Sequence, residues 1–168
     1  MLLKFCHLAF FRIFVLSCAH SVAVNKLIIN TITTNMENWG ALTYYCAISL
    51  TLIAYLLGSI PSAVWIGKRY YGIDIREHGS KNAGTTNMLR VLGKRAAIPV
   101  FIIDFFKGFL AVTLMFIMRF DPCVTPAWEI NMRIIATIAV VLGHIFPIFA
   151  EFKGGKGVAT LVGAMTGN

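Results

Sequence analysis

The chain has 168 residues, of which 58 % are hydrophobic and 13 % charged, and its mean hydropathy is +0.76. This composition is too apolar for a soluble domain, whose exterior must stay hydrated. The formal net charge of +8 would suit nucleic acid, but the basic residues lie between apolar stretches rather than along one soluble face, so we predict no nucleic-acid partner. The four cysteines are scattered without a Cys-x-x-Cys pair, and we expect no disulfide framework, metal site or cofactor.

Residues 1–35 allow two interpretations. An apolar run over residues 13–24 is short for a membrane span but fits a signal-peptide core, and residues 21–23 resemble a cleavage site. The same segment could be an upstream extension before a start at Met36. We favour the extension, because the motifs described below all follow Met36, and we assign residues 36–168 to one domain.

Three apolar stretches follow, over residues 41–66, 98–118 and 134–150. A helix that crosses about 30 Å of hydrocarbon uses about 20 residues. A fourth apolar helix starts after Gly157, but the sequence ends at Asn168 before it could cross, so we expect the domain to be truncated. The expected fold is all-α, a multi-pass transmembrane helical bundle with three complete spans and the start of a fourth.

The first span contains the sequence Gly-Ser-Ile-Pro-Ser at residues 58–62. Proline removes a helix donor, and small residues allow either a kink or close helix packing. We favour close packing.

The loop over residues 67–97 carries seven Lys or Arg residues against only Asp74 and Glu77. The positive-inside rule places such a loop in the cytoplasm. Two further crossings then bring Lys153 and Lys156 to the same side of the membrane.

Residues 79–90 combine glycines, short hydroxyl and amide side chains, and cations. Glycines let the backbone turn so that several N–H groups converge, which is what an oxyanion site requires. The same composition also suits a polar loop in which Asn and Gly supply the turns. The residues alone leave both interpretations open.

A second Gly-rich segment, residues 152–160, holds Lys153 and Lys156 and runs directly into an expected helix. Free amides at a helix N-terminus favour anions. The segment is not a Walker A loop, because Gly157 follows Lys156 where Ser or Thr is required. We favour phosphate binding over a flexible turn that faces lipid phosphates.

Ionisable residues also occur inside the second and third spans. Asp104 and Lys107 could face a polar site or pair with each other, since they are spaced i, i+3. His144 lies near the cytoplasmic end of the third span, shortly before the Gly-rich turn. All these elements fall on one membrane side, which indicates a site for phosphorylated substrates.

Three other functions fit the sequence less well. A transporter or channel for a phosphorylated solute would gather the same groups, but it predicts polar residues near the middle of several spans. A scaffold gives no reason for a Gly-rich turn that opens a helix. Coenzyme-A-type acyltransferases commonly have an Asp a few residues after the His, and none of the four histidines here has one.

At these residues the sequence resembles the bacterial integral-membrane acyl-phosphate:glycerol-3-phosphate acyltransferases, over roughly residues 36–168. The resemblance is carried by Gly58-Ser59-Ile60-Pro61, Asp74-Ile75-Arg76, Gly79-Ser80-Lys81-Asn82-Ala83-Gly84-Thr85-Thr86-Asn87 with Arg90, Asp104-Phe105-Phe106-Lys107-Gly108, Gly143-His144-Ile145-Phe146-Pro147, and Lys153-Gly154-Gly155-Lys156-Gly157-Val158-Ala159-Thr160.

The resemblance implies transfer of a fatty acyl group from acyl phosphate to the 1-hydroxyl of glycerol 3-phosphate, without coenzyme A or metal. The product would be lysophosphatidic acid, made at the cytoplasmic face of the bacterial inner membrane. The expected catalytic residues are Ser80, Arg90 and Lys156. The expected substrate-binding residues are Asn82, Gly84, Asn87, Lys107, His144, Lys153, Gly154, Gly155, Gly157 and Thr160.

The sequence departs from the family pattern in two ways. Lys81 and Thr85 stand where the family more often has Gly and Ala. The family's third cytoplasmic motif, with a functional histidine and asparagine, would lie beyond Asn168, so this chain alone is expected to lack part of the site.

Overall fold

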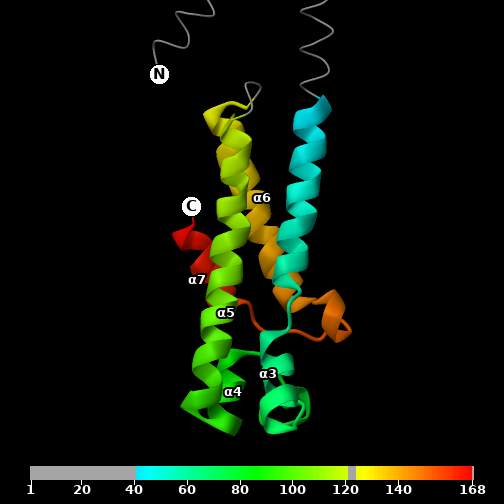
Figure 1. The fold of residues 1–168 in the computed structure, drawn as a ribbon, viewed down its shortest axis with the longest axis vertical. Coiled ribbons are helices and arrows are strands. Elements are labelled where there is room, and N and C mark those ends of the chain that lie inside the picture. Colours follow the sequence, from blue (N-terminus) through cyan, green and yellow to red (C-terminus); the bar gives the residue numbers. More distant parts are fainter. Residues whose placement is uncertain (1–40, 121–123, 168) are drawn as a thin grey trace, which may run out of the picture. The chain divides into compact units, whose positions relative to one another are not determined.

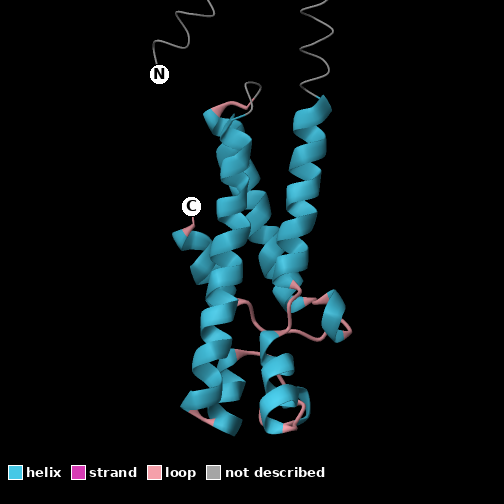
Figure 2. Ribbon diagram, in the orientation of Figure 1, coloured by secondary structure: helices cyan, strands magenta, loops and turns pink. Residues whose placement is uncertain are grey.

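The computed structural model describes residues 41–120 and 124–167, and the expected extension over residues 1–35 lies outside them. Every regular element in the described part of the chain is a helix (Figure 2). A first helix covers residues 41–58. It is followed by α3 (Ser62–Tyr71), η1 (Ile75–Glu77), α4 (Thr85–Leu92), α5 (Lys94–Thr113), η2 (Leu114–Phe120), α6 (Pro126–Ile145), η3 (Ile148–Ala150) and α7 (Val158–Thr166).

Within the described residues, three stretches are long and apolar enough to cross a membrane: Ala41–Tyr71, Lys94–Ile117 and Pro126–Ala150. Large apolar side chains on each of them are exposed, as expected where lipid replaces water, for example Leu52, Ile102 and Ile138. Figure 1 shows the first helix, α5 and α6 running alongside one another, with α7 beside α5. The expected all-α fold with three spans and the start of a further helix is confirmed.

The first span is interrupted at the Gly-Ser-Ile-Pro-Ser sequence, where the residues allowed a kink as well as close packing. The helix ends at residue 58, and α3 begins at Ser62. Pro61 has no N–H to donate, so the regular hydrogen-bond ladder cannot pass through it. The break aims α3 away from the first helix, so that α3 meets α5 at the end of the bundle where α4 also lies (Figure 1).

The other two spans begin earlier than expected. Helix α5 starts at Lys94 instead of residue 98, and Pro99 lies inside it instead of opening it. Helix α6 starts at Pro126 instead of residue 134, with the Thr125 hydroxyl accepting a hydrogen bond from the Trp128 N–H. Both helices therefore begin before the apolar stretches. Charged residues are tolerated in these first turns because the turns lie outside the apolar segment.

Glycines let the helices approach closely, as expected for the small residues of the first span. A methyl group on Gly58 would overlap the carbonyl oxygen of Val140 on α6. The same holds for Gly108 on α5, which faces the carbonyl of Thr160 on α7, and for Gly163 on α7, which faces that of Phe105. The preference for close packing is therefore confirmed at Gly58.

Gly163→Ala is expected to destabilise the protein, because the added methyl overlaps backbone that cannot rotate away. Overpacking of this kind costs about 1–3 kcal/mol. The melting temperature in detergent measures the effect, with the exposed Met165→Ala on the same helix as the control. Equal melting temperatures for the two variants would show that α5 and α7 are not held this tightly.

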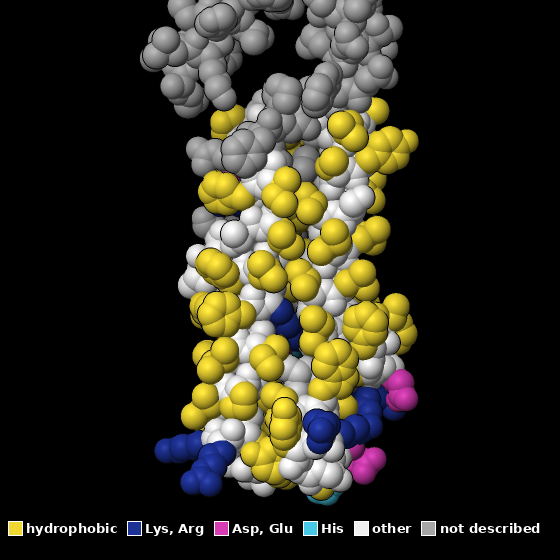
Figure 3. Space-filling model, viewed as in Figure 1, with side chains coloured by type: hydrophobic (Ala, Val, Ile, Leu, Met, Phe, Trp, Pro, Cys, Tyr) yellow, Lys and Arg dark blue, Asp and Glu magenta, His cyan; other side chains and the backbone are white. Residues whose placement is uncertain are grey.

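The basic loop expected over residues 67–97 contains a further helix, α4, flanked by Gly84 and Gly93. Its buried Met88 packs with Ile75 and Val100 in a small core that joins α3, α4 and α5. Lys and Arg side chains gather at this end, while apolar side chains cover the rest of the visible face (Figure 3). The elements α3, η1 and α4 thus form a folded cap on one end of the bundle.

Candidate active site

A cavity of about 250 Å³ lies where this cap meets α5, α6 and the start of α7. Its lining combines polar and apolar side chains from four separate segments of the chain. The lining residues are Ser80, Asn82, Gly84, Thr85, Thr86, Asn87, Arg90, Phe101, Asp104, His144, Lys156, Gly157, Val158 and Ala159.

Helix α4 points its N-terminus at the cavity. Its first intrahelical bonds come from Asn87 and Met88 to the Gly84 carbonyl, so the helix itself offers no acceptor to the amides of Thr85 and Thr86. Gly84 supplies no side-chain cap, and within the described structure the buried Thr85 hydroxyl has no hydrogen-bond partner. This end of α4 therefore offers unused donors to an anion.

Helix α7 presents a second N-terminus to the same cavity. Gly157 precedes it with φ 74°, a left-handed conformation that glycine adopts without strain. The first intrahelical bond runs from Leu161 N–H to the Gly157 carbonyl, and Val158 and Ala159 line the cavity from the first turn. Two helix N-termini of positive polarity thus face one space.

Arg90 and Lys156 add full charges to this space. Both are exposed and line the cavity, and neither pairs with a carboxylate among the described residues. Ser80 lines the same wall as Arg90. Two unpaired cations beside two helix N-termini form a strongly anion-selective site, suited to phosphate groups.

Lys107 lies outside the cavity lining. Its buried ammonium pairs with Asp104 at 2.8 Å and donates to the carbonyl of Ile60 at 3.0 Å. Asp104 also accepts a 2.7 Å hydrogen bond from the Ser62 hydroxyl. The two residues therefore pair with each other and bond the polar groups that the break in the first span leaves inside the bundle. Asp104 also lines the cavity, whereas Lys107 does not.

His144 lies on the cavity wall between polar neighbours. Its Nδ1 is 3.1 Å from the Thr160 hydroxyl and 3.7 Å from Asp104 Oδ1. Thr160 itself is fully buried and does not line the cavity. Since Thr160 holds the imidazole, its contribution to the site is indirect.

The first two glycines of the Gly-rich turn close the end of α6. Gly154 N–H and Gly155 N–H donate to the carbonyls of Ile145 and His144, each at 3.1 Å. A methyl on Gly155 would overlap the imidazole of His144. Both glycines lie behind the cavity lining, and the exposed Lys153 lies outside it. The turn is therefore packed against the end of α6 and is not a free loop.

Asn87 holds the loop that carries Ser80. Its side-chain amide donates to the carbonyls of Ile75 and His78, and its side-chain oxygen accepts the Ser80 N–H at 2.9 Å. The residue is buried and its polar atoms are engaged within the protein. These contacts give Asn87 a positioning role.

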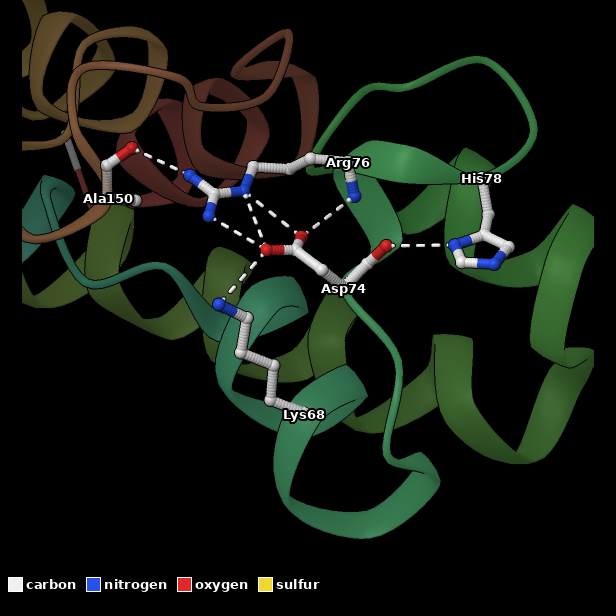
Figure 4. A network of polar contacts seen from close by, with 5 residues as sticks. All are labelled: Lys68, Asp74, Arg76, His78 and Ala150. Carbon is white, nitrogen blue, oxygen red and sulfur yellow. Dashed lines mark hydrogen bonds and ion pairs between the residues drawn. The ribbon is translucent and has the colours of Figure 1, made fainter.

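A second network surrounds Asp74, just before η1 (Figure 4). Its carboxylate accepts hydrogen bonds from the backbone N–H, Nε and Nη2 of Arg76 and pairs with Lys68 at 3.0 Å. Arg76 Nη1 donates to the carbonyl of Ala150 at 3.0 Å, and His78 Nδ1 donates to the carbonyl of Asp74. The side-chain hydrogen bond from Arg76 holds the pKa of Asp74 well below its ordinary value, and the same bond raises the pKa of Arg76.

The lowered pKa predicts how the stabilisation by Asp74 depends on pH. A carboxylate whose pKa falls on folding stabilises the protein above its unfolded pKa of 3.8, and the contribution declines as pH falls below that value. The charged groups around it are Lys68 and Arg76, with Glu77 and Glu151 facing Arg76. Asp74→Asn should therefore lower the melting temperature by an amount that is constant from about pH 8 to about pH 5 and shrinks below about pH 4. A difference that grows on acidification would contradict this.

Most of the expected site residues meet in the cavity: Ser80, Asn82, Gly84, Asn87, Arg90, His144, Lys156 and Gly157. The sequence did not single out Thr86, Phe101, Val158 or Ala159 as site residues. Phe101 could have been found, because it precedes Asp104 by three residues and so shares its face of α5.

Comparisons with known proteins identify the family of the chain. The family model described as glycerol-3-phosphate acyltransferase matches residues 48–168. A glycerol-3-phosphate acyltransferase of Streptococcus pneumoniae (strain Taiwan19F-14) is 53 % identical over 120 residues, which cover 71 % of this chain and 53 % of the relative. The relative from strain Hungary19A-6 is 52 % identical over the same shares. The chain thus spans about half the length of the curated relatives it matches.

Two solved structures are also similar, both of PlsY (YgiH), an integral membrane glycerol 3-phosphate acyltransferase. The glycerol 3-phosphate form is 41 % identical with a TM-score of 0.62, covering 73 % of this chain and 57 % of that one. The lysophosphatidic acid form is 38 % identical with a TM-score of 0.58, covering 73 % and 56 %. By its sequence, its membrane helices and this fold, the chain belongs to the glycerol-3-phosphate acyltransferase family.

Proposed function

We propose that the cavity binds glycerol 3-phosphate and that the protein transfers a fatty acyl group from acyl phosphate to its 1-hydroxyl, releasing lysophosphatidic acid and phosphate. The observation that carries the proposal is the meeting of two helix N-termini with Arg90 and Lys156 around one cavity. The relatives and solved structures are named for glycerol 3-phosphate, which supports this choice of anion.

Phosphate binding follows from the charges. A phosphate monoester carries close to two negative charges at neutral pH. Arg90 and Lys156 would neutralise them, while the amides of Thr85 and Thr86 and the Ser80 hydroxyl would donate hydrogen bonds. His144 and Asn82 line the same cavity and would contact the substrate.

Acyl phosphate is proposed as the acyl donor because of its own reactivity. An acyl phosphate is a mixed anhydride and is already activated, so no protein nucleophile is needed. Binding both substrates side by side and stabilising the developing charge would carry most of the rate. The 1-hydroxyl oxygen attacks the acyl carbon, the bond from that carbon to the phosphate oxygen breaks, and a substrate phosphate oxygen accepts the hydroxyl proton.

The side of the membrane that the site faces is inferred from the basic end of the bundle. Lys and Arg side chains gather where α3 and α4 lie (Figure 3), and such loops remain in the cytoplasm. The site would therefore face the cytoplasm from the bacterial inner membrane. Exposed Phe101 and Val158 line the cavity beside apolar membrane-facing surface, which suits an acyl substrate that comes from the bilayer.

The test is acyl transfer by the full-length protein in liposomes, with labelled glycerol 3-phosphate and either a long-chain acyl phosphate or the matching acyl-CoA. We expect labelled lysophosphatidic acid from acyl phosphate alone. Product from acyl-CoA alone would refute the donor. Uptake of glycerol 3-phosphate without any acylated product would instead identify a transporter.

A further inference from the structure

The two loops that carry the phosphate-binding groups are joined by one side chain. Arg76 lies four residues before Ser80, and Ala150, whose carbonyl accepts a hydrogen bond from Arg76 Nη1, lies six residues before Lys156. Figure 4 shows the guanidinium extended between η1 and the end of η3. We propose that Arg76, oriented by Asp74, is a positioning residue that ties these loops together and so sets the affinity of the cavity for its phosphorylated substrate.

Asp74 fixes the direction of the guanidinium. Its carboxylate accepts from Nε and Nη2 of Arg76, a two-bond geometry that leaves Nη1 free to reach Ala150. Asp74 and Arg76 side chains are only 12 % and 18 % exposed, so water competes little for these bonds. Two parallel bonds hold the planar group in one orientation, which a single ammonium could not match.

The turn on the other side of the bridge needs such support. Glu151 and Phe152, which directly follow Ala150, both adopt positive φ, at 57° and 58°. Non-glycine residues in this region cost about 1 kcal/mol or more each and persist only when neighbouring contacts hold them. Arg76 supplies such a contact from another part of the chain, and the Lys153 N–H supplies a second to the same carbonyl.

The bridge continues into the opposite wall of the cavity. Asn87 on α4 binds the carbonyls of Ile75 and His78, on either side of Arg76, and also the Ser80 N–H. A continuous set of hydrogen bonds therefore runs from α4 through η1 and Arg76 to the turn before Lys156. The loops on both sides of Arg76 are therefore ordered before substrate binds. The binding free energy is then not reduced by the cost of ordering them.

The inference rests on the proposed function and is tested in the same protein. Arg76→Ala should raise KM for glycerol 3-phosphate about tenfold or more while kcat at saturation changes little, because the lost order is restored only when substrate binds. Arg76→Lys should keep most of the KM defect, because a lysine keeps the charge but not the fork. Asp74→Asn should also raise KM, and the double variant should be no worse than Arg76→Ala alone. Arg95→Ala, an exposed arginine outside the cavity lining, is the matched control.

Hydrogen exchange of the backbone over residues 151–157 gives a readout that does not depend on turnover. Exchange there should be faster in Arg76→Ala than in Arg95→Ala, with α5 and α6 unchanged. If Arg76→Ala does not fold, Arg76→Lys carries both measurements. A KM and an exchange rate equal to those of Arg95→Ala, or full rescue by Arg76→Lys, would overturn the inference. Absence of acyl transfer in the unsubstituted full-length protein would instead overturn the proposed function, and hydrogen exchange would still decide the bridge.

Discussion

Lys156→Ala is expected to lower kcat/KM for glycerol 3-phosphate by about 10²–10³-fold, the usual effect of removing one charged or hydrogen-bonding group that stabilises a transition state. The side chain lines the same cavity as Arg90, next to the N-terminus of α7, and no carboxylate among the described residues neutralises it. Steady-state acyl transfer measures the change.

The matched control is Lys94→Ala, which removes an exposed lysine at the start of α5, outside the cavity lining. We expect this control to retain activity within a few-fold of the unsubstituted protein. Equal losses in both variants would indicate a general dependence on basic charge at this end of the bundle, not a specific role for Lys156.

Lys107→Met is expected to cause the largest loss of stability, about 3–5 kcal/mol, because it leaves a buried carboxylate without its cation. Asp104 is 1 % exposed, and its remaining partners are the Ser62 hydroxyl and the more distant His144. The carbonyl of Ile60 also loses one of its two donors and keeps the Ser62 N–H. Equilibrium unfolding in mixed micelles measures the effect.

A second substitution separates charge from packing. Lys107→Met combined with Asp104→Leu should recover part of the lost stability, since replacing a whole buried pair by apolar residues costs far less than breaking it. It should not recover all of it, because the Ile60 carbonyl still lacks the Lys107 ammonium and keeps only the Ser62 N–H as a donor. A single Lys107→Met variant as stable as the unsubstituted protein would show that the pair does not support the break in the first span.

The sequence predicted the parts of the fold that depend on composition. Long apolar stretches identified all three spans, because only a helix satisfies the backbone inside a bilayer. Because the chain crosses the membrane twice between the two Gly-rich segments, they were predicted to lie at the same end of the bundle. The structure confirms this, since Ser80, Arg90 and Lys156 line one cavity. Helix α4 was not predicted, because its eight residues lie in a loop dominated by basic and turn-forming residues.

The rest depends on contacts that leave no pattern in the sequence. Lys107 was ambiguous because its deciding partner is a backbone carbonyl, of Ile60, that becomes free only where the first span breaks. The sequence identifies Arg76 only as part of a motif. Its partner is the backbone carbonyl of Ala150, and every residue type has such a carbonyl, so this contact leaves no signal in the sequence. The indirect role of Thr160, through His144, likewise requires the packing of α7 on α6.

The most direct test of the account is a calorimetric titration of the protein in nanodiscs with glycerol 3-phosphate and, separately, with glycerol. Because Arg90 and Lys156 line the cavity, we predict saturable binding of glycerol 3-phosphate, no measurable binding of glycerol, and loss of binding in a folded Arg90→Ala, Lys156→Ala double variant. Undiminished binding of glycerol 3-phosphate to that double variant would contradict the account.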